Sequence, residues 1–239
     1  MNIALILSGG TGARLGGEIP KQYLPCRGPM MITRCLNPVF AHEALDAVQI
    51  VAADGWRDAI LREMETFVFA QNASRGKKLL GFSVPGETRQ LSILSGLRDI
   101  ACKAADEDVV MVHDAARPRL SSRLISDGLA ALNGHDGVMP VLPMKDTVYL
   151  SRDGRAVSKL LPRNEVFAGQ APEFFRLGKY LQANEALPQE TMLSINGATE
   201  PAILAGLDIA MVPGDEANFK ITTAADLERY LTLLETEKS

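Results

Sequence analysis

The alternation of short apolar runs with longer amphipathic segments most restricts the fold of this 239-residue chain. Short runs rich in β-branched residues predict strands over residues 3–7, 47–52, 80–84, 109–113, 137–142 and 209–212. Amphipathic segments predict helices near 31–42, 55–70, 88–103, 121–133 and 174–186, and from 223 to about 234. This alternation is typical of a mostly parallel sheet with helices on both faces, and the length fits a single three-layer α/β domain.

Two helix starts carry capping signals. Ser121 or Ser122 opens the helix near 121–133. Thr223 is followed three residues later by Asp226, which is the spacing of a capping box with Asp in place of Glu. We therefore expect both helices to begin at these residues.

Residues 147–160 break the alternation and predict two short strands around the turn pair Asp153-Gly154. An isolated two-stranded hairpin is marginally stable in water, so it should pack against another surface. A second copy of the chain is the first expectation, which makes residues 145–166 a dimerisation arm. The alternative is that the hairpin folds back on its own sheet.

Charge and cysteine content exclude several classes of protein. The chain has 25 Lys plus Arg against 29 Asp plus Glu, which argues against a general nucleic-acid or anionic-membrane binder. Its three cysteines show no C-x-x-C spacing, so neither a disulfide framework nor a zinc site is indicated. The apolar run at residues 3–7 is too short for a signal peptide or a membrane span, so we expect a cytoplasmic protein.

A glycine-rich loop follows the first predicted strand and reads Leu7-Ser-Gly-Gly-Thr-Gly-Ala-Arg-Leu-Gly-Gly-Glu-Ile-Pro-Lys-Gln22. Closely spaced glycines let main-chain N–H groups approach an anion, and Arg14 and Lys21 add two positive charges, a combination that suits a polyphosphate. The loop is neither a dinucleotide fingerprint, because Leu15 stands where the third glycine belongs, nor a P-loop, because Lys21 is followed by Gln22. A purely structural glycine turn is the alternative.

Further blocks occur in a fixed order along the chain: Gly86-Glu-Thr-Arg-Gln-Leu-Ser92, Val112-His-Asp-Ala-Ala-Arg-Pro118, Lys145-Asp-Thr147 and Asn218-Phe-Lys-Ile-Thr-Thr223. With these blocks and the loop, the chain resembles the 2-C-methyl-D-erythritol 4-phosphate cytidylyltransferase family, including its ribitol-5-phosphate relatives. The resemblance implies a single Rossmann-like nucleotidyltransferase domain over residues 1–239 that transfers CMP from CTP to a small polyol phosphate. It also implies Mg²⁺ or another divalent cation as cofactor, and a homodimer formed through the arm.

The resemblance also implies roles for individual residues. It makes Arg14 and Lys21 the catalytic cations that hold the triphosphate, and Asp114 the metal ligand. Nucleotide-binding residues would be Ser8, Gly9, Gly10, Thr11, Gly12, Gly86, Arg89 and Ser92. Acceptor-binding residues would be Arg117, Thr147, Arg163 and Lys220, with Thr147 and Arg163 reaching across from the arm of the other subunit.

The residues themselves leave plainer alternatives open. Asp114 can cap the following turn, and Arg117 can be its ion-pair partner. Ser92 can be an ordinary serine of an early helical turn. His113 is expected to be a core histidine rather than a catalytic base, and Asn218 to hold a local turn.

Two segments depart from the family pattern, both towards the acceptor half. Gln170-Ala-Pro-Glu173 stands where the family usually reads Gln-Thr-Pro-Gln, which removes a hydroxyl and adds a negative charge. Asn196-Gly197 stands where the family reads Thr-Asp, with Thr199-Glu200 as a shifted substitute. Methylerythritol phosphate is the expected acceptor, and ribitol phosphate or another polyol phosphate of surface-polymer synthesis is the alternative. A catalytically silent nucleotide-binding protein is the alternative from another class.

Overall fold

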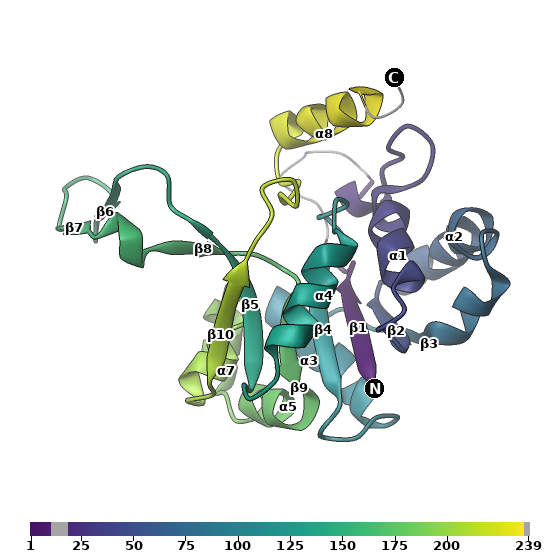
Figure 1. The fold of residues 1–239 in the computed structure, drawn as a ribbon, viewed down its shortest axis with the longest axis horizontal. Coiled ribbons are helices and arrows are strands. Elements are labelled where there is room, and N and C mark those ends of the chain that lie inside the picture. Colours follow the sequence, from purple (N-terminus) through teal and green to yellow (C-terminus); the bar gives the residue numbers. More distant parts are fainter. Residues whose placement is uncertain (11–18, 237–239) are drawn as a thin grey trace.

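The strands form one large mixed sheet and a separate small one (Figure 1). A computed structural model describes residues 1–10 and 19–236. Within that part, an eight-stranded sheet has the order β10-β5-β9-β4-β1-β2-β3, with β8 paired to β5. Its strands are β1 (Asn2–Leu7), β2 (Ala47–Val51), β3 (Leu79–Ser83), β4 (Val109–Asp114), β5 (Gly137–Pro143), β8 (Phe167–Gly169), β9 (Glu173–Arg176) and β10 (Ile209–Pro213). Every predicted strand is confirmed to within one residue at each end.

The sheet is mostly parallel, as predicted. Strands β4, β1, β2 and β3 are parallel neighbours, and β10 is parallel to β5. The register pairs Leu7 with both Asp114 and Val51. The carboxyl ends of these three strands therefore meet at one edge of the sheet, where open α/β sheets bind their ligands.

The prediction of a helix over residues 174–186 is wrong for its first three residues. Residues 173–176 form β9, which runs antiparallel between β4 and β5. Phe174 packs in the core on one face of the sheet and Phe175 in the core on the other. A period of two over four residues is too short to be told from the helix that follows it.

The helices are α1 (Met31–Ala41), α2 (Asp54–Met64), α3 (Arg89–Ala101), α4 (Ser122–Ala131), α5 (Leu177–Glu185), α6 (Gln189–Ser194), α7 (Glu200–Leu204) and α8 (Ala224–Thr236). The segment predicted as one helix over 55–70 is α2 continued by a π-helical turn, Glu65–Phe69. The short elements α6, α7 and β8 were not predicted, because each is shorter than the window that a periodic pattern needs.

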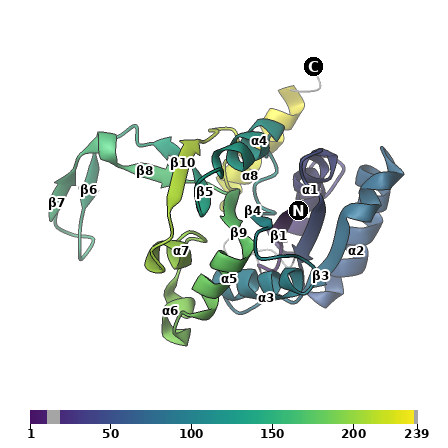
Figure 2. The same ribbon diagram turned by 60° about the horizontal axis from the view of Figure 1, so that its bottom comes forward.

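Helices cover both faces of the sheet (Figure 2). Ala4 and Ile6 of β1 face a core shared with α1, α2 and α4. Ile3 and Leu5 face the opposite core, which is shared with α3, α5 and α7. This alternation follows from the two-residue period of a strand that is buried on both sides. A third cluster joins α8 to the start of α1, with Tyr230 and Leu234 packed near Met31.

Both capping predictions are confirmed. Ser121 accepts a hydrogen bond from the main-chain N–H of Leu124 at the start of α4. At α8 the Thr223 N–H donates to Asp226 Oδ2 (2.8 Å), and the Asp226 N–H donates back to Thr223 Oγ1 (3.2 Å).

The predicted hairpin is present and projects from the body of the molecule (Figure 1). Strands β6 (Val148–Leu150) and β7 (Lys159–Leu161) pair antiparallel as a sheet of their own. At the tip, Gly154 has φ +70, and Asp153 Oδ1 accepts hydrogen bonds from the N–H groups of Arg155 and Ala156. Several apolar side chains of this arm are exposed, namely Tyr149, Leu150, Val157 and Leu160.

Two further expectations concern cysteines and membrane spans. Cys26, Cys35 and Cys102 are all free, as predicted. In the described part of the chain, no helix has both the length and the apolar character needed to cross a bilayer.

His113 lies in the core, as expected, on the face of β4 opposite to its neighbour Asp114. Its side chain is fully buried, Nε2 lies 3.2 Å from the Arg117 carbonyl oxygen, and Nδ1 has no hydrogen-bond partner. Burial lowers the pKa of His113 to about 4, and the nearby Asp114 carboxylate opposes that shift only in part. The imidazole is therefore neutral at physiological pH.

We predict that Gly128→Ala destabilises the protein, whereas Gly55→Ala does not. A Cβ at Gly128 of α4 would overlap the ring of buried Phe174, while one at Gly55 of α2 would meet no atom within 4 Å. Overpacking costs about 1–3 kcal/mol, and an unhindered helical Gly→Ala change gains up to about 1 kcal/mol. Urea unfolding of both variants measures this, and equal stability of the two would contradict the packing.

We also predict that stability falls on acidification because of His113. The unfolded-state pKa of histidine is about 6.5, so between about pH 6.5 and 4 the unfolded chain binds a proton that the folded chain excludes. By about pH 5 this removes roughly 2 kcal/mol of stability. Unfolding at several pH values, together with an NMR titration of the His113 ring, measures the effect. A ring that titrates near its ordinary midpoint would contradict the assigned environment.

Candidate active site

A cavity of about 700 Å³ opens at the edge where the parallel strands end. Segments far apart in the sequence form its wall: the glycine loop after β1, the loop before α3, the end of β4 and the segment before α8. The lining residues are Leu7, Gly9, Gly10, Lys21, Gln22, Ala53, Pro85, Gly86, Glu87, Thr88, Arg89, Ser92, Asp114, Ala116, Lys220 and Thr222. Many of the predicted site residues therefore lie around one space.

The start of the glycine loop is anchored by two residues that the sequence did not single out. Gln22 Nε2 donates to the carbonyl oxygens of Ser8 (2.7 Å) and Gly10 (2.6 Å). The Tyr23 hydroxyl donates to the Ser8 carbonyl (2.7 Å) and accepts from Ser8 Oγ (2.8 Å). Tyr23 in turn stacks on Trp56, with 4.2 Å between ring centroids. These bonds fix the main chain where the loop enters the cavity.

The two glycines at the start of the loop, Gly9 and Gly10, have different surroundings. A Cβ on Gly9 would overlap Pro85, so glycine lets the loop approach the 85–88 segment closely. A Cβ on Gly10 would meet nothing within 4 Å. Of these two glycines, Gly10 therefore has room beside it for a ligand to approach its main chain.

Gly86 and Ser92 shape the opposite wall. The Gly86 N–H donates to Ser92 Oγ (3.0 Å), and that hydroxyl donates to the Thr88 carbonyl (2.9 Å). A Cβ on Gly86 would overlap Leu91 in the first turn of α3. The Ser92 hydroxyl thus holds the loop in shape, and its role in nucleotide binding stays a prediction.

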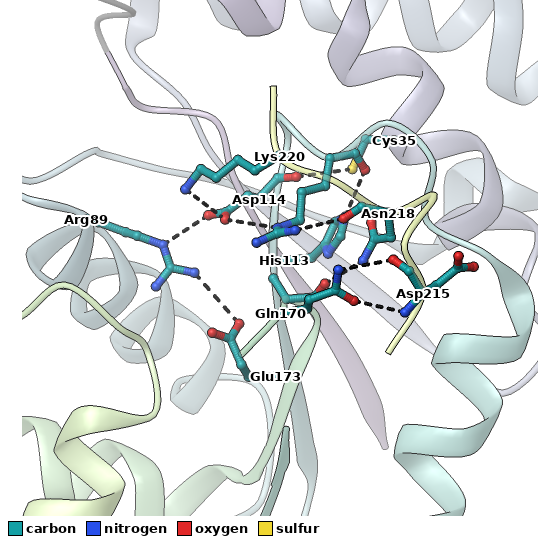
Figure 3. A network of polar contacts seen from close by, with 11 residues as sticks. Cys35, Arg89, His113, Asp114, Gln170, Glu173, Asp215, Asn218 and Lys220 are labelled. Carbon is teal, nitrogen blue, oxygen red and sulfur yellow. Dashed lines mark hydrogen bonds and ion pairs between the residues drawn. The ribbon is translucent and has the colours of Figure 1, made fainter. Parts of the chain in front are cut away.

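Asp114, at the end of β4, is the centre of the charged cluster (Figure 3). Its Oδ1 lies 3.0 Å from Arg89 Nε, and its Oδ2 lies 3.0 Å from Lys220 Nζ. Arg117 Nε is 3.8 Å from the same Oδ2. Burial alone would raise the pKa of Asp114, but the charges of Arg89, Lys220 and Arg117 hold it well below its usual range. Asp114 is therefore a carboxylate at any physiological pH.

Arg117 is held from behind by the segment before α8. Its Nη1 donates to the Asn218 carbonyl (2.7 Å), and Asn218 Nδ2 donates to the Ala171 carbonyl (2.7 Å). The Asn218 N–H also bonds to the Asp215 carbonyl, so Asn218 holds the local turn as expected. The ion-pair alternative for Arg117 is thus observed, and Arg117 is not among the residues that line the cavity.

Glu173 belongs to the same cluster, although the sequence pointed to it only as a departure from the family. Its carboxylate is buried, and Oε2 lies 3.7 Å from Arg89 Nη2 (Figure 3). Burial raises the pKa of Glu173, and the Arg89 charge opposes this. The change from Gln to Glu is the signal that could have identified it.

Two predicted acceptor residues lie away from the cavity. Thr147 and Arg163 are exposed on the arm, where Arg163 Nη1 donates to the Lys145 carbonyl (3.1 Å). Thr11, Gly12 and Arg14 lie outside the described residues. Lys21 lines the cavity, and so does Lys220.

Asp114 suits a hard divalent cation. Mg²⁺ commonly takes one or two carboxylates and completes its coordination with phosphate oxygens and water. A buried, permanently ionised carboxylate at the wall of the cavity fits that donor set.

Comparison with known proteins supports the resemblance. The family model described as 2-C-methyl-D-erythritol 4-phosphate cytidylyltransferase matches residues 2–235. A Chromobacterium violaceum protein of that name is 35% identical over 228 residues, which cover 94% of each chain. The Rhizorhabdus wittichii "Bifunctional enzyme IspD/IspF" is 34% identical over 94% of this chain and 54% of its own, so the chain spans about half the length of such bifunctional relatives.

A ribitol-5-phosphate cytidylyltransferase of Streptococcus agalactiae is also similar, with 28% identity over the whole of this chain and 98% of its own. Among solved structures, 4-diphosphocytidyl-2C-methyl-D-erythritol synthase from Anaerococcus prevotii aligns with a TM-score of 0.79 at 22% identity, covering 98% of this chain and 96% of that one. This alignment confirms the predicted nucleotidyltransferase-type fold. By the match over residues 2–235, the chain belongs to the 2-C-methyl-D-erythritol 4-phosphate cytidylyltransferase family.

Proposed function

We propose that this chain transfers CMP from CTP to 2-C-methyl-D-erythritol 4-phosphate and releases pyrophosphate, as a step of isoprenoid precursor synthesis in the cytoplasm. The observation that carries the proposal is the gathering of Lys21, Lys220 and Asp114 around one cavity. Cations beside an ionised carboxylate suit a nucleoside triphosphate that arrives with a divalent metal. The volume of about 700 Å³ lies in the range of small-ligand sites.

The chemistry is a direct displacement at phosphorus. An oxygen of the acceptor phosphate attacks the α-phosphorus of CTP, and the bond between the α-phosphorus and the bridging oxygen breaks. Pyrophosphate leaves with that electron pair. When bound at Asp114, Mg²⁺ supplies charge neutralisation for the phosphate oxygens.

The side chains of this chain position the reactants and balance their charge. Lys21, with Arg14, would hold the triphosphate and stabilise the charge that develops on the α-phosphate oxygens. Lys220, whose Nζ lies 3.0 Å from Asp114 Oδ2, would attract the acceptor phosphate. The open space beside Gly10 would let the phosphates reach the main chain of the loop.

The identity of the acceptor is the most specific part of the proposal. The Chromobacterium violaceum relative is named for methylerythritol phosphate, and the Streptococcus agalactiae relative for ribitol phosphate. The higher identity of the first supports methylerythritol phosphate. The similarity to the Streptococcus agalactiae protein supports ribitol phosphate as the alternative acceptor. The departures from the family pattern at Ala171 and Glu173 lie towards the acceptor half, so they also leave this alternative open.

The exposed apolar side chains of the arm support an active site that is shared between two subunits. Tyr149 and Leu160 are each 58% exposed on it, which is unusual for large apolar side chains unless another surface covers them. Thr147 and Arg163 are not among the residues that line the cavity of their own chain, and the β6–β7 hairpin projects from the body of the molecule (Figure 1). We therefore include in the proposal a homodimer in which the partner's arm brings these two residues to the acceptor.

Pyrophosphate release from CTP and Mg²⁺ tests the function with methylerythritol phosphate, ribitol phosphate and glycerol phosphate as acceptors. We expect turnover with methylerythritol phosphate and little with the other two. Turnover only with ribitol phosphate would favour the alternative acceptor. No release with any of them would favour a silent nucleotide-binding protein.

We predict that two inactive variants restore activity when mixed. Lys21→Ala should lower turnover by a factor of about 10²–10³, because a cation is removed from the developing charge. Arg163→Ala should lower activity by weakening acceptor binding. Mixed dimers contain one site with both residues intact, so random subunit exchange should recover about one quarter of wild-type activity.

The matched control mixes Lys21→Ala with Asp114→Ala. Both residues line the cavity of one subunit, so mixed dimers should contain no intact site. Mass spectrometry verifies subunit exchange in both mixtures. The shared site is wrong if the first mixture stays inactive after exchange.

A further inference from the structure

Glu173 shares Arg89 with Asp114, the expected metal ligand. Glu173 pairs with Val112 across strands β9 and β4, and Asp114 is two residues further along β4 on the same face. Arg89, the first residue of α3, reaches both carboxylates with different nitrogens (Figure 3). Its guanidinium therefore lies between two buried carboxyl groups.

The oxygens of Asp114 are already occupied by cations. Arg89 takes Oδ1 at 3.0 Å, and Lys220 takes Oδ2 at the same distance. A divalent cation needs at least one of these oxygens, and a positive charge left within about 4 Å of it would repel it. Moving one of these cations away from Asp114 would lower this repulsion when the metal binds.

Glu173 can accept a hydrogen bond from Arg89 if Arg89 leaves Asp114. Arg89 Nη2 is 3.7 Å from Glu173 Oε2, which is too long for a hydrogen bond. That Oε2 is buried and has no hydrogen-bond partner, which is costly for a buried polar atom. Arg117, in contrast, is bonded to the Asn218 carbonyl and is only 13% exposed.

We propose that Arg89 transfers from Asp114 to Glu173 when Asp114 binds the metal that accompanies CTP, and that Glu173 is the positioning residue that makes this transfer favourable. The inference rests on the proposed function, because it takes the metal and CTP to bind at Asp114. Glu173 does not touch the reactants. It acts by holding Arg89 away from the metal in a charge-assisted hydrogen bond, which would form when the present distance of 3.7 Å between Arg89 Nη2 and Glu173 Oε2 shortens.

The proposal depends on the charge of residue 173, which is Glu in this chain. An amide accepts a hydrogen bond but carries no charge, so it holds an arginine less strongly than a carboxylate does. Glu173→Gln therefore removes the charge and preserves the shape.

Manganese binding measured by electron paramagnetic resonance in the presence of CTP tests the proposal without turnover. We expect Glu173→Gln to weaken Mn²⁺ binding about tenfold, because a charged hydrogen-bond partner for Arg89 is lost. CTP binding without metal should change little. The matched control is Glu185→Gln, which removes another carboxylate that pairs with an arginine of α3, Arg98 at 2.9 Å, outside the cavity. This control should bind Mn²⁺ as the wild type does.

A crystal structure of the wild type with CTP and Mg²⁺ gives a second readout that needs no variant. We expect Arg89 Nη2 within hydrogen-bonding distance of Glu173 Oε2, and Arg89 Nε away from Asp114. The proposal is overturned if Arg89 stays on Asp114, if Glu173 itself coordinates the metal, or if Glu173→Gln binds Mn²⁺ as tightly as the wild type. A wild type that binds no Mn²⁺ with CTP refutes the proposed function and this inference together, whereas normal wild-type binding with an unchanged variant refutes only the inference.

Discussion

The arrangement of this site depends on the ion pairs that the Asp114 carboxylate makes. This carboxylate balances the charges of Arg89 from α3, Arg117 from the turn after β4 and Lys220 from the segment before α8. Without it, three positive charges would face one another at a largely buried position, which is strongly unfavourable. The same carboxylate is the ligand expected for the metal. In the arrangement proposed above, metal binding rearranges the ion pairs that Asp114 makes with these side chains.

The fold brings this carboxylate and the glycine loop together through the register of two strands. Leu7 and Asp114 are partners on β1 and β4, so the loop that begins at Ser8 starts beside the carboxylate. Gln22 and Tyr23 then hold the loop by its carbonyl groups. The local sequence contains the glycines and the cations, and the pairing of β1 with β4 brings the start of the loop close to Asp114.

Much of this was predictable from the sequence because the signals were local or periodic. Strands buried on both faces read as continuous apolar runs, and the capping box at Thr223 needs only residues three apart. The hairpin was marked by Asp153-Gly154. These features form between residues that are close together in the sequence, so a local sequence pattern is enough to predict them.

The missed features depend on contacts between distant residues. Strand β9 has only four residues, and its place between β4 and β5 is set by pairing on both sides. Gln22 and Tyr23 anchor the loop through hydrogen bonds that leave no pattern in the sequence. The role of Glu173 appears only when Arg89 is seen to lie between it and Asp114.

Calorimetry of CTP binding with and without Mg²⁺, on the wild type and on Asp114→Asn, tests the central claim most directly. If Asp114 is the point where nucleotide, metal and cations meet, Mg²⁺ tightens CTP binding by the wild type and adds nothing to binding by the variant. An equal gain from Mg²⁺ in both proteins, or no CTP binding by the wild type, would contradict the account.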